Sequence, residues 1–172
     1  ANTYTDVSML GTLTKLEDLW LGNTGSVIDN IDFVANMPDL KELRLEWEEV
    51  SNLTPLTNLT NLELLVMYGN NISDISPLAN LTNVWWIHLM FNNIDDISAL
   101  AGMTSLSTAY LNDNNISDLS PLENHPSLGT LLLDDNQITD ISVLTTMPNF
   151  YSVSLANNPT LDTSAGSPQL AI

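Results

Sequence analysis

The stretch that decides the fold is residues 62–83, LELLVMYGNNISDISPLANLTN. Copies of it recur along the chain, and in the cleanest part the first apolar residue returns every 22 positions. This residue is, in turn, Leu40, Leu62, Val84, Leu106, Leu128 and Phe150. A repeat of this length predicts a solenoid, in which each copy forms one coil and buries its apolar residues only against neighbouring coils.

We number the positions of one repeat as columns, with Leu62 in column one. Apolar residues occupy columns one, four, six, eleven, fourteen, seventeen and twenty. The alternation around columns four and six is typical of a short strand with one buried face. It predicts seven parallel strands that begin near residues 18, 42, 64, 86, 108, 130 and 152. Column six, which includes Leu111, is expected to lie in the core.

Two polar columns mark the places where each coil turns. An Asn side chain has both a donor and an acceptor, so it can bond the backbone of adjacent coils. Column nine holds such a ladder, formed by Asn70, Asn92, Asn114, Asn136 and Asn158. Glu48 interrupts it, so we expect that coil to turn differently. Column thirteen carries Asp, as in the DISPL stretch at 74–78, and this predicts a carboxylate that caps a short helical turn beginning at Ser-Pro.

The motif N-x-I-x-D-I-S-P-L-x-x-L-T-N-L, which begins at Asn70, resembles the 22-residue class of leucine-rich repeats in bacterial internalins. It resembles more loosely the class found in eukaryotic phosphatase regulators. The resemblance covers about residues 4–158 and implies an α/β solenoid. In such a solenoid a right-handed, curved parallel β-sheet lines the concave side, and short 3-10 or helical turns line the convex side. For function it implies a binding scaffold.

The repeats also define the predicted domain organisation. Residues 1–161 are assigned to one leucine-rich repeat domain of about seven coils, the first and last partial, and residues 162–172 to a C-terminal tail or linker. The helical N-terminal cap, the C-terminal immunoglobulin-like domain and the Lys-rich repeats of internalins are not seen in the sequence. Without an initiator Met or a signal peptide, we expect a mature or excised part of a longer protein.

Composition excludes several classes of function. The formal net charge is −18, because 21 Asp and Glu face only three basic residues, Lys15, Lys41 and Arg44. Nucleic acid and anionic membrane surfaces are therefore excluded as ligands, and no apolar run approaches the ~18 residues of a membrane span. The absence of Cys excludes disulfides and thiolate metal sites. Without any catalytic motif, we expect no enzyme activity and no cofactor.

Aromatic residues gather in the columns that point out of the predicted sheet, which are columns two, three, five, seven and eight. These columns hold eight of the 11 aromatic residues. An exposed aromatic patch with a polar surround marks an interaction site, since Trp and Tyr supply large, rigid contact areas. The alternative is that the rings pack on one another or under a cap. The predicted partner-binding surface comprises Trp20, Arg44, Trp47, Val66, Tyr68, Trp85, Trp86, His88, Met90, Phe91, Tyr110, Leu132 and Tyr151.

This surface predicts a binding module of an extracellular or cell-surface protein, with a host or neighbouring cell-surface protein as partner. Aliphatic residues between the rings, Val66 and Met90 among them, favour a protein ligand over a sugar. A glycan-binding face and an inert spacer in a surface stalk are the alternatives.

Three acidic residues and one histidine lead to two further predictions. The carboxylates of Asp113, Asp134 and Asp135 lie in adjacent outward columns and are a candidate for Ca²⁺, although they lack the spacing of an EF-hand. We assign no metal on this basis, because these side chains can simply face water. His125 replaces an apolar residue of column twenty, and we expect it to be satisfied locally or exposed.

Overall fold

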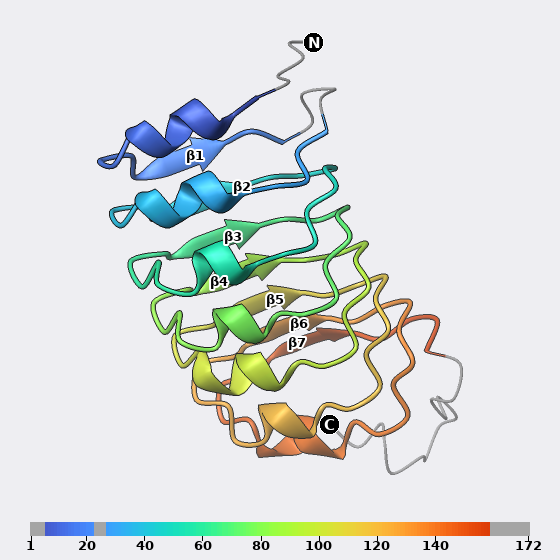
Figure 1. Cartoon of the computed structure of the whole chain (residues 1–172). Helices are drawn as coiled ribbons and strands as arrows, with labels where there is room; N and C mark the ends of the chain where they lie inside the picture. Colours follow the sequence, from blue (N-terminus) through green and yellow to red (C-terminus); the bar gives the residue numbers. More distant parts are fainter. Residues whose placement is uncertain (1–5, 23–26, 159–172) are drawn as a thin grey trace.

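One short strand per coil builds a parallel sheet in this computed structural model, which describes residues 6–22 and 27–158. Within these residues seven strands pair in the order of the sequence (Figure 1). They are β1 (Asp18–Trp20), β2 (Glu42–Arg44), β3 (Leu64–Val66), β4 (Trp86–His88), β5 (Thr108–Tyr110), β6 (Thr130–Leu132) and β7 (Ser152–Ser154). The predicted strand positions and the leucine-rich repeat fold are confirmed. The predicted tail at 162–172 lies outside the described residues.

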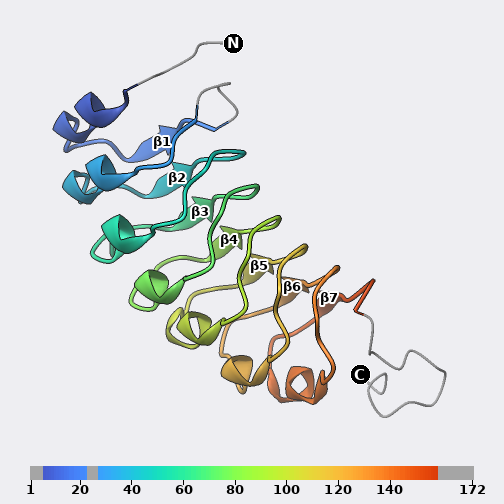
Figure 2. The ribbon, with the colours of Figure 1, turned by 45° about the vertical axis from the view of Figure 1, so that its right-hand side comes forward.

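Each coil returns through a short 3-10 turn on the side away from the sheet. These turns are η1 (Ser8–Thr12), η2 (Asp32–Asn36), η3 (Thr54–Leu56), η4 (Ser76–Leu78), η5 (Ser98–Gly102), η6 (Ser120–Leu122) and η7 (Ser142–Thr146). Figure 2 shows the strands on the inner side of the curved ribbon and the turns on its outer side. Within the described part of the chain, no helix has the length and apolar character needed to cross a membrane.

The core is a continuous file of apolar side chains between the sheet and the turns. Leu43, Leu65, Ile87, Ala109 and Leu131 lie side by side in the strand register and are fully buried. The column-six residues Leu45, Met67, Leu89, Leu111 and Leu133 are fully buried as well. Because burying one such side chain contributes about 1.5–3 kcal/mol, stacking the coils is the main source of stability.

The Asn ladder forms as predicted. The Nδ2 atom of Asn92 donates to the carbonyl of Met67 in the preceding coil (3.0 Å) and to that of Leu89 in its own coil (3.1 Å). Its Oδ1 atom accepts from the N–H of Ile72 (3.0 Å). The other Asn residues of column nine repeat this arrangement. Each side chain therefore ties two successive coils together where the strand ends.

Glu48 does not alter the path of its coil, so that expectation was wrong. Its Oε2 atom accepts from the N–H of Ile28 at 2.9 Å, which is the bond that an Asn Oδ1 makes elsewhere in the ladder. The preceding residue, Trp47, has φ 56°, in line with the same column of the later coils. A carboxylate at this position supplies the acceptor that the turn needs.

The column-thirteen carboxylates begin the outer turns, as predicted. Oδ1 of Asp74, Asp96, Asp118 and Asp140 accepts the N–H of the Ser two residues later at 2.7–2.8 Å. These bonds hold the pKa of Asp74, Asp96 and Asp140 below the usual value. The file of acids on the convex side is therefore accounted for by local structure.

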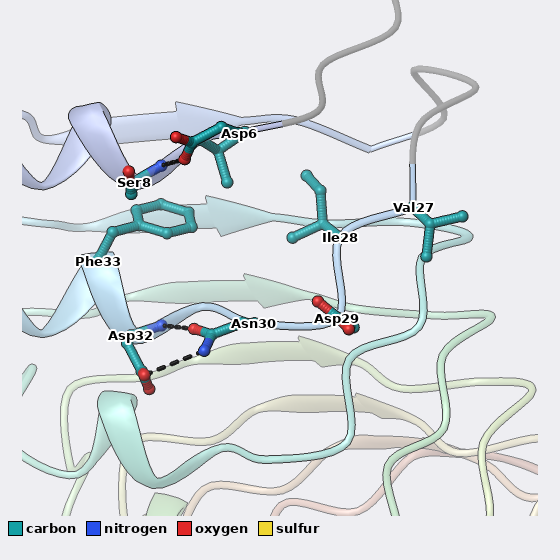
Figure 3. Close-up of a pocket in the computed structure, with 9 residues that line it drawn as sticks. Asp6, Ser8, Val27, Ile28, Asp29, Asn30, Asp32 and Phe33 are labelled. Atoms are coloured by element: carbon teal, nitrogen blue, oxygen red, sulfur yellow. Dashed lines mark hydrogen bonds between the residues drawn. The ribbon is translucent and has the colours of Figure 1, made fainter.

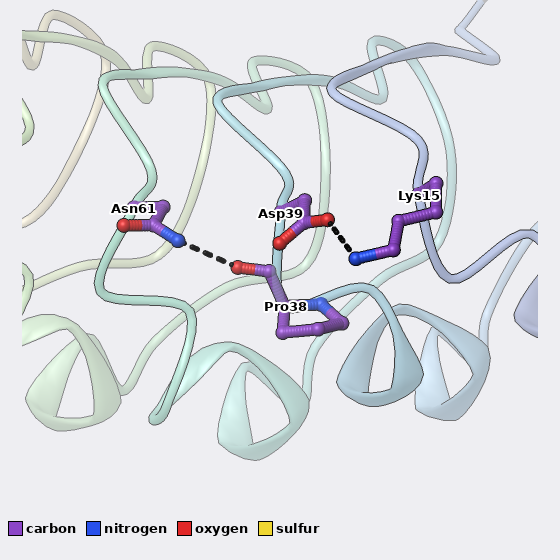
Figure 4. Close-up of polar contacts among 4 residues, drawn as sticks. All are labelled: Lys15, Pro38, Asp39 and Asn61. Carbon is purple, nitrogen blue, oxygen red and sulfur yellow. Dashed lines mark hydrogen bonds and ion pairs between the residues drawn. The ribbon is translucent and has the colours of Figure 1, made fainter.

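A second polar ladder, which the sequence analysis did not predict, joins the loops that enter the strands (Figure 4). The Nδ2 atom of Asn61 donates to the carbonyl of Pro38 in the preceding coil at 2.9 Å. Asn83 and Asn149 make the same bond in later coils, at 2.8 and 2.6 Å. Between the first two coils, Asp39 occupies the position of these Asn residues. Its carboxylate cannot donate, and an ion pair with Lys15 (2.9 Å) takes the place of the amide bond.

Candidate functional site

The outward side of the sheet, which we call the strand face, is formed by columns two, three, five, seven and eight. The register aligns Arg44, Val66, His88 and Tyr110 in one row across the strands. Trp86 lies in the neighbouring row, between Leu64 and Thr108. The repeat thus brings together side chains that are far apart in sequence.

Seven rings on this face form one connected network, which we call the aromatic band. Its members are Trp47, Tyr68, Trp85, Trp86, His88, Phe91 and Tyr110. Tyr68 packs against His88 with a centroid distance of 4.5 Å, and the edge of Tyr110 meets Trp86 at 5.9 Å. Trp85 stacks on Trp86 at 6.1 Å. Rings that pack on one another were the alternative to an open binding surface, and part of the band is packed in this way. Three of the rings, Trp47, Trp85 and Phe91, nevertheless keep 43–55% of their surface exposed.

His88 occupies the middle of the band. Its ring contacts Tyr68, Trp86 and Tyr110, and its Nε2 atom lies 2.9 Å from the sulfur of Met90. Burial lowers the pKa of His88 below its ordinary value. The imidazole is therefore neutral at neutral pH and acts as another flat, weakly polar ring.

Basic side chains lie only at the first two coils of the strand face. The guanidinium of Arg44 lies over the Trp20 ring, 4.8 Å from its centroid, and one of its nitrogens is 3.4 Å from Glu42. Lys41 pairs with Glu17 at 2.6 Å. The sequence contains no Lys or Arg after Arg44, so the aromatic band and everything beyond it carry only neutral and acidic groups.

The predicted site residues fall into three classes of exposure. Val66 is only 2% exposed and offers no surface to a partner; it lies between Arg44 and His88 in the register, and both of these side chains are longer. Leu64 is buried in the same way. The half-buried residues are Arg44, Tyr68, Trp86, His88, Met90, Tyr110 and Leu132, and the exposed ones are Trp20, Trp47, Trp85, Phe91 and Tyr151. Tyr151 stands apart from the band, over Gly129 at the end of the sheet.

Two of the three candidate calcium ligands, Asp134 and Asp135, are engaged by the protein itself. Asp134 accepts from the Ser154 hydroxyl and from the Ala156 N–H, both at 2.6 Å, and from the Asn112 amide at 2.6 Å. Asp135 accepts from Asn157 at 3.0 Å. In residues 6–22 and 27–158, no group of three or more His, Asp or Glu side chains is arranged to hold a metal ion.

The ring nitrogens of His125 have hydrogen-bond partners nearby, which is one of the two outcomes predicted from the sequence. It is 3% exposed; its Nδ1 atom accepts from the N–H of Leu128 (3.1 Å), and its Nε2 atom lies 3.3 Å from the carbonyl of Leu100. It is therefore a structural residue and takes no part in the strand face.

The hollows away from the strand face lie among the turns and loops. One of about 370 Å³ lies between the first two coils and is lined by residues such as Phe33 and Asp32 (Figure 3). Asp6 there accepts from Ser8, and Asn30 bonds both the N–H and the carboxylate of Asp32. These polar groups serve the turns, so the strand face is the better candidate site.

One property of the strand face was missed from sequence. All six described residues of column eight have positive φ, between 54° and 71°. They are Trp47, Gly69, Phe91, Asp113, Asp135 and Asn157. The signal was present, because Gly, Asp and Asn are the residues that tolerate this left-handed conformation.

Known structures resemble this chain over nearly its whole length. An internalin C2 of Listeria monocytogenes is 37% identical over 90% of this chain and 68% of its own, with a TM-score of 0.81. An internalin of the same organism, InlF, is 35% identical over 91% of this chain, which spans about half of that protein (49%), with a TM-score of 0.79. A leucine-rich repeat protein of Leptospira interrogans, 20% identical over 91% of this chain and 41% of its own, shares the fold (TM-score 0.81). No family model and no curated protein matches the sequence.

Proposed function

The chain belongs to the internalin family of leucine-rich repeat proteins, and from that membership we propose that it is a non-enzymatic module that binds another protein through its aromatic band. The observation that carries the proposal is the band itself. Seven rings meet on the outward side of the sheet, and three of them remain about half exposed. Folding alone gives no reason to place large rings on the solvent side of the sheet.

A protein partner suits this surface better than a glycan. The rings meet edge to face at Trp47–Tyr68 (89°) and at Trp86–Tyr110 (81°). Stacked pairs lie between them, at Trp47–Phe91 (27°) and Trp85–Trp86 (28°). The surface is therefore uneven and apolar, which suits the side chains of a protein better than one flat platform for sugar rings would. Met90, half-buried beside His88, adds an aliphatic contact. Desolvated aromatic residues at the centre of an interface commonly carry about 2 kcal/mol or more of its binding energy.

We further propose an extracellular or cell-surface location and a partner on a host or neighbouring cell. Support comes from the internalin relationship and from a chain without Cys whose charge excludes nucleic acid.

The test is affinity capture of surface-exposed proteins by the chain, followed by measurement of Kd for the captured partner. Trp85→Ala and Tyr110→Ala should each weaken binding at least about thirtyfold, since both residues lie in the band and outside the core. Asp96→Ala and Asn80→Ala on the convex side are the matched controls and should leave Kd unchanged. Loss of binding in the convex variants with normal binding in the band variants would refute the proposal. Glycan-array binding without any captured protein would favour the sugar alternative.

A further inference from the structure

Two members of the aromatic band stand where the backbone disfavours them. Column eight has positive φ at all six of its described residues, and the later coils meet this requirement with Asp113, Asp135 and Asn157. Trp47 (φ 56°) and Phe91 (φ 54°) are bulky residues in the same left-handed conformation, which is rare and strained for such side chains. Strain of this kind persists where the surrounding structure enforces it, and it concentrates at binding sites.

Gly69 lies between these two residues and leaves room for their rings to meet. A Cβ atom at Gly69 would lie 2.4 Å from the Trp47 ring, so a larger residue would displace it. The Trp47 and Phe91 rings stack with centroids 5.7 Å apart and planes at 27°. They keep 55% and 43% of their surface exposed, and we call this pair the Trp47–Phe91 shelf.

Negative charge borders the shelf, and no cation of the chain lies after it in sequence. Asp113 follows Phe91 in column eight, and the N–H of Asn92 donates to its carbonyl at 3.2 Å. Burial, together with the charges of Asp135 and Asp134, raises the pKa of Asp113, so a nearby cation would relieve an existing repulsion. The first indole of the strand face, Trp20, already carries a guanidinium from within the chain.

We propose that the Trp47–Phe91 shelf is the subsite on which the protein partner places an arginine or lysine side chain, with its cation over the rings and close to Asp113. The ring face is electronegative and attracts a cation, and the net charge of −18 strengthens that attraction at low and moderate salt. The proposal rests on the proposed function, because it names the chemistry of the group that this partner presents.

The test uses a penta-arginine peptide as the probe and the uncharged penta-citrulline peptide as its isostere, both titrated into the whole chain at 150 mM salt. Trp47→Asn and Phe91→Asn keep the net charge and restore a residue type that column eight favours. Each should weaken penta-arginine binding about threefold to thirtyfold, while the thermal midpoint stays within about 5 °C of the parent or rises. Met9→Asn also keeps the net charge; it removes an exposed apolar side chain from η1, outside the strand face, and should leave the affinity unchanged.

Equal binding of penta-arginine by the parent and both shelf variants would overturn the proposal, since the peptide would then respond only to overall charge. Equal binding of penta-citrulline and penta-arginine would overturn it as well, by showing that stacking without a cation suffices. The captured partner separates the two proposals. If Trp85→Ala and Tyr110→Ala abolish partner binding while Trp47→Asn and Phe91→Asn do not, the binding face stands and the cation subsite is wrong.

Discussion

The strand face has two halves that share one backbone and differ in how their side chains are satisfied. In the half around β3 and β4, columns seven and eight carry Tyr68, Gly69, Met90 and Phe91, and the rings remain partly open. In the half from β5 to β7, the same columns carry Asn and Asp, apart from Ala156. Asp134 there accepts from three donors, the Asn112 amide, the Ser154 hydroxyl and the Ala156 N–H. The repeat therefore sets the backbone and the core, and it leaves the outward columns free to differ.

The largest effect is expected where both halves share one core. Leu111 is fully buried in column six, and Leu111→Ala should cost about 2–5 kcal/mol. All four Trp residues precede residue 87, so Trp fluorescence reports on the aromatic half, whereas far-UV circular dichroism reports on all coils. We expect the two denaturation curves of the variant to shift together. Separate transitions would show that the halves unfold independently.

The Asn ladder should give the next largest effect. Asn114 bonds the N–H of Ile94 and the carbonyls of Leu89 and Leu111, so Asn114→Ala should cost about 1–3 kcal/mol in urea denaturation. Asn115 is exposed and serves as the matched control, because its N–H bond to Ile94 belongs to the backbone and survives Asn115→Ala. A neutral Asn114→Ala would mean that the ladder does not hold the coils together.

Much of this architecture could be predicted from the sequence, because the inward columns obey one simple physical requirement. Seven apolar positions in each coil must be buried against neighbours, and their spacing alone located the strands. The Asn ladder could be predicted for a similar reason, since a turn with buried backbone groups requires a residue that both donates and accepts. Such constraints act within a single repeat and recur in every coil.

The outward columns could be predicted only in part. The sequence placed Val66 on the strand face, but its burial depends on the length of Arg44 and His88 in the adjacent strands. The stack of Trp47 on Phe91 depends on Gly69 between them, a relation across three coils that no single repeat contains. The partners of Asp134 likewise come from two neighbouring coils. These features follow from which residues become neighbours after folding.

The polar half should respond to mutation in the opposite way to the aromatic half. Asp134→Ala removes three hydrogen bonds and should cost about 1 kcal/mol of stability. It should change the affinity for the captured partner less than about twofold when measured in high salt, where long-range charge effects are screened. Asp135→Asn, which changes an exposed side chain and keeps a residue type suited to its φ of 57°, is the control for stability. Strong loss of partner binding in Asp134→Ala would extend the binding site into the polar half.

The smallest effect concerns the two histidines, His88 on the strand face and His125 among the buried residues. Burial lowers the pKa of His125, and its Nδ1 atom accepts from the N–H of Leu128, so protonation would set two donors against each other. The unfolded chain then binds the proton more readily than the folded chain. The free energy of unfolding is therefore unaffected by His125 above the ordinary histidine pKa of about 6.5, and it declines as the pH falls through that value.

His125→Met should therefore flatten the dependence of unfolding free energy on pH between about 7 and 5, because Met fills the same column at Met37, Met103 and Met147. Urea denaturation at several pH values measures the unfolding free energy. We expect its change between about pH 7 and pH 5 that is due to His125 to be smaller than the loss caused by Asn114→Ala. His88→Gln is the control from the aromatic half. His88 is only half-buried and its nearest polar contact is the sulfur of Met90, so its replacement should change the slope less. A greater loss of the pH dependence in His88→Gln than in His125→Met would place the proton-sensitive group on the strand face.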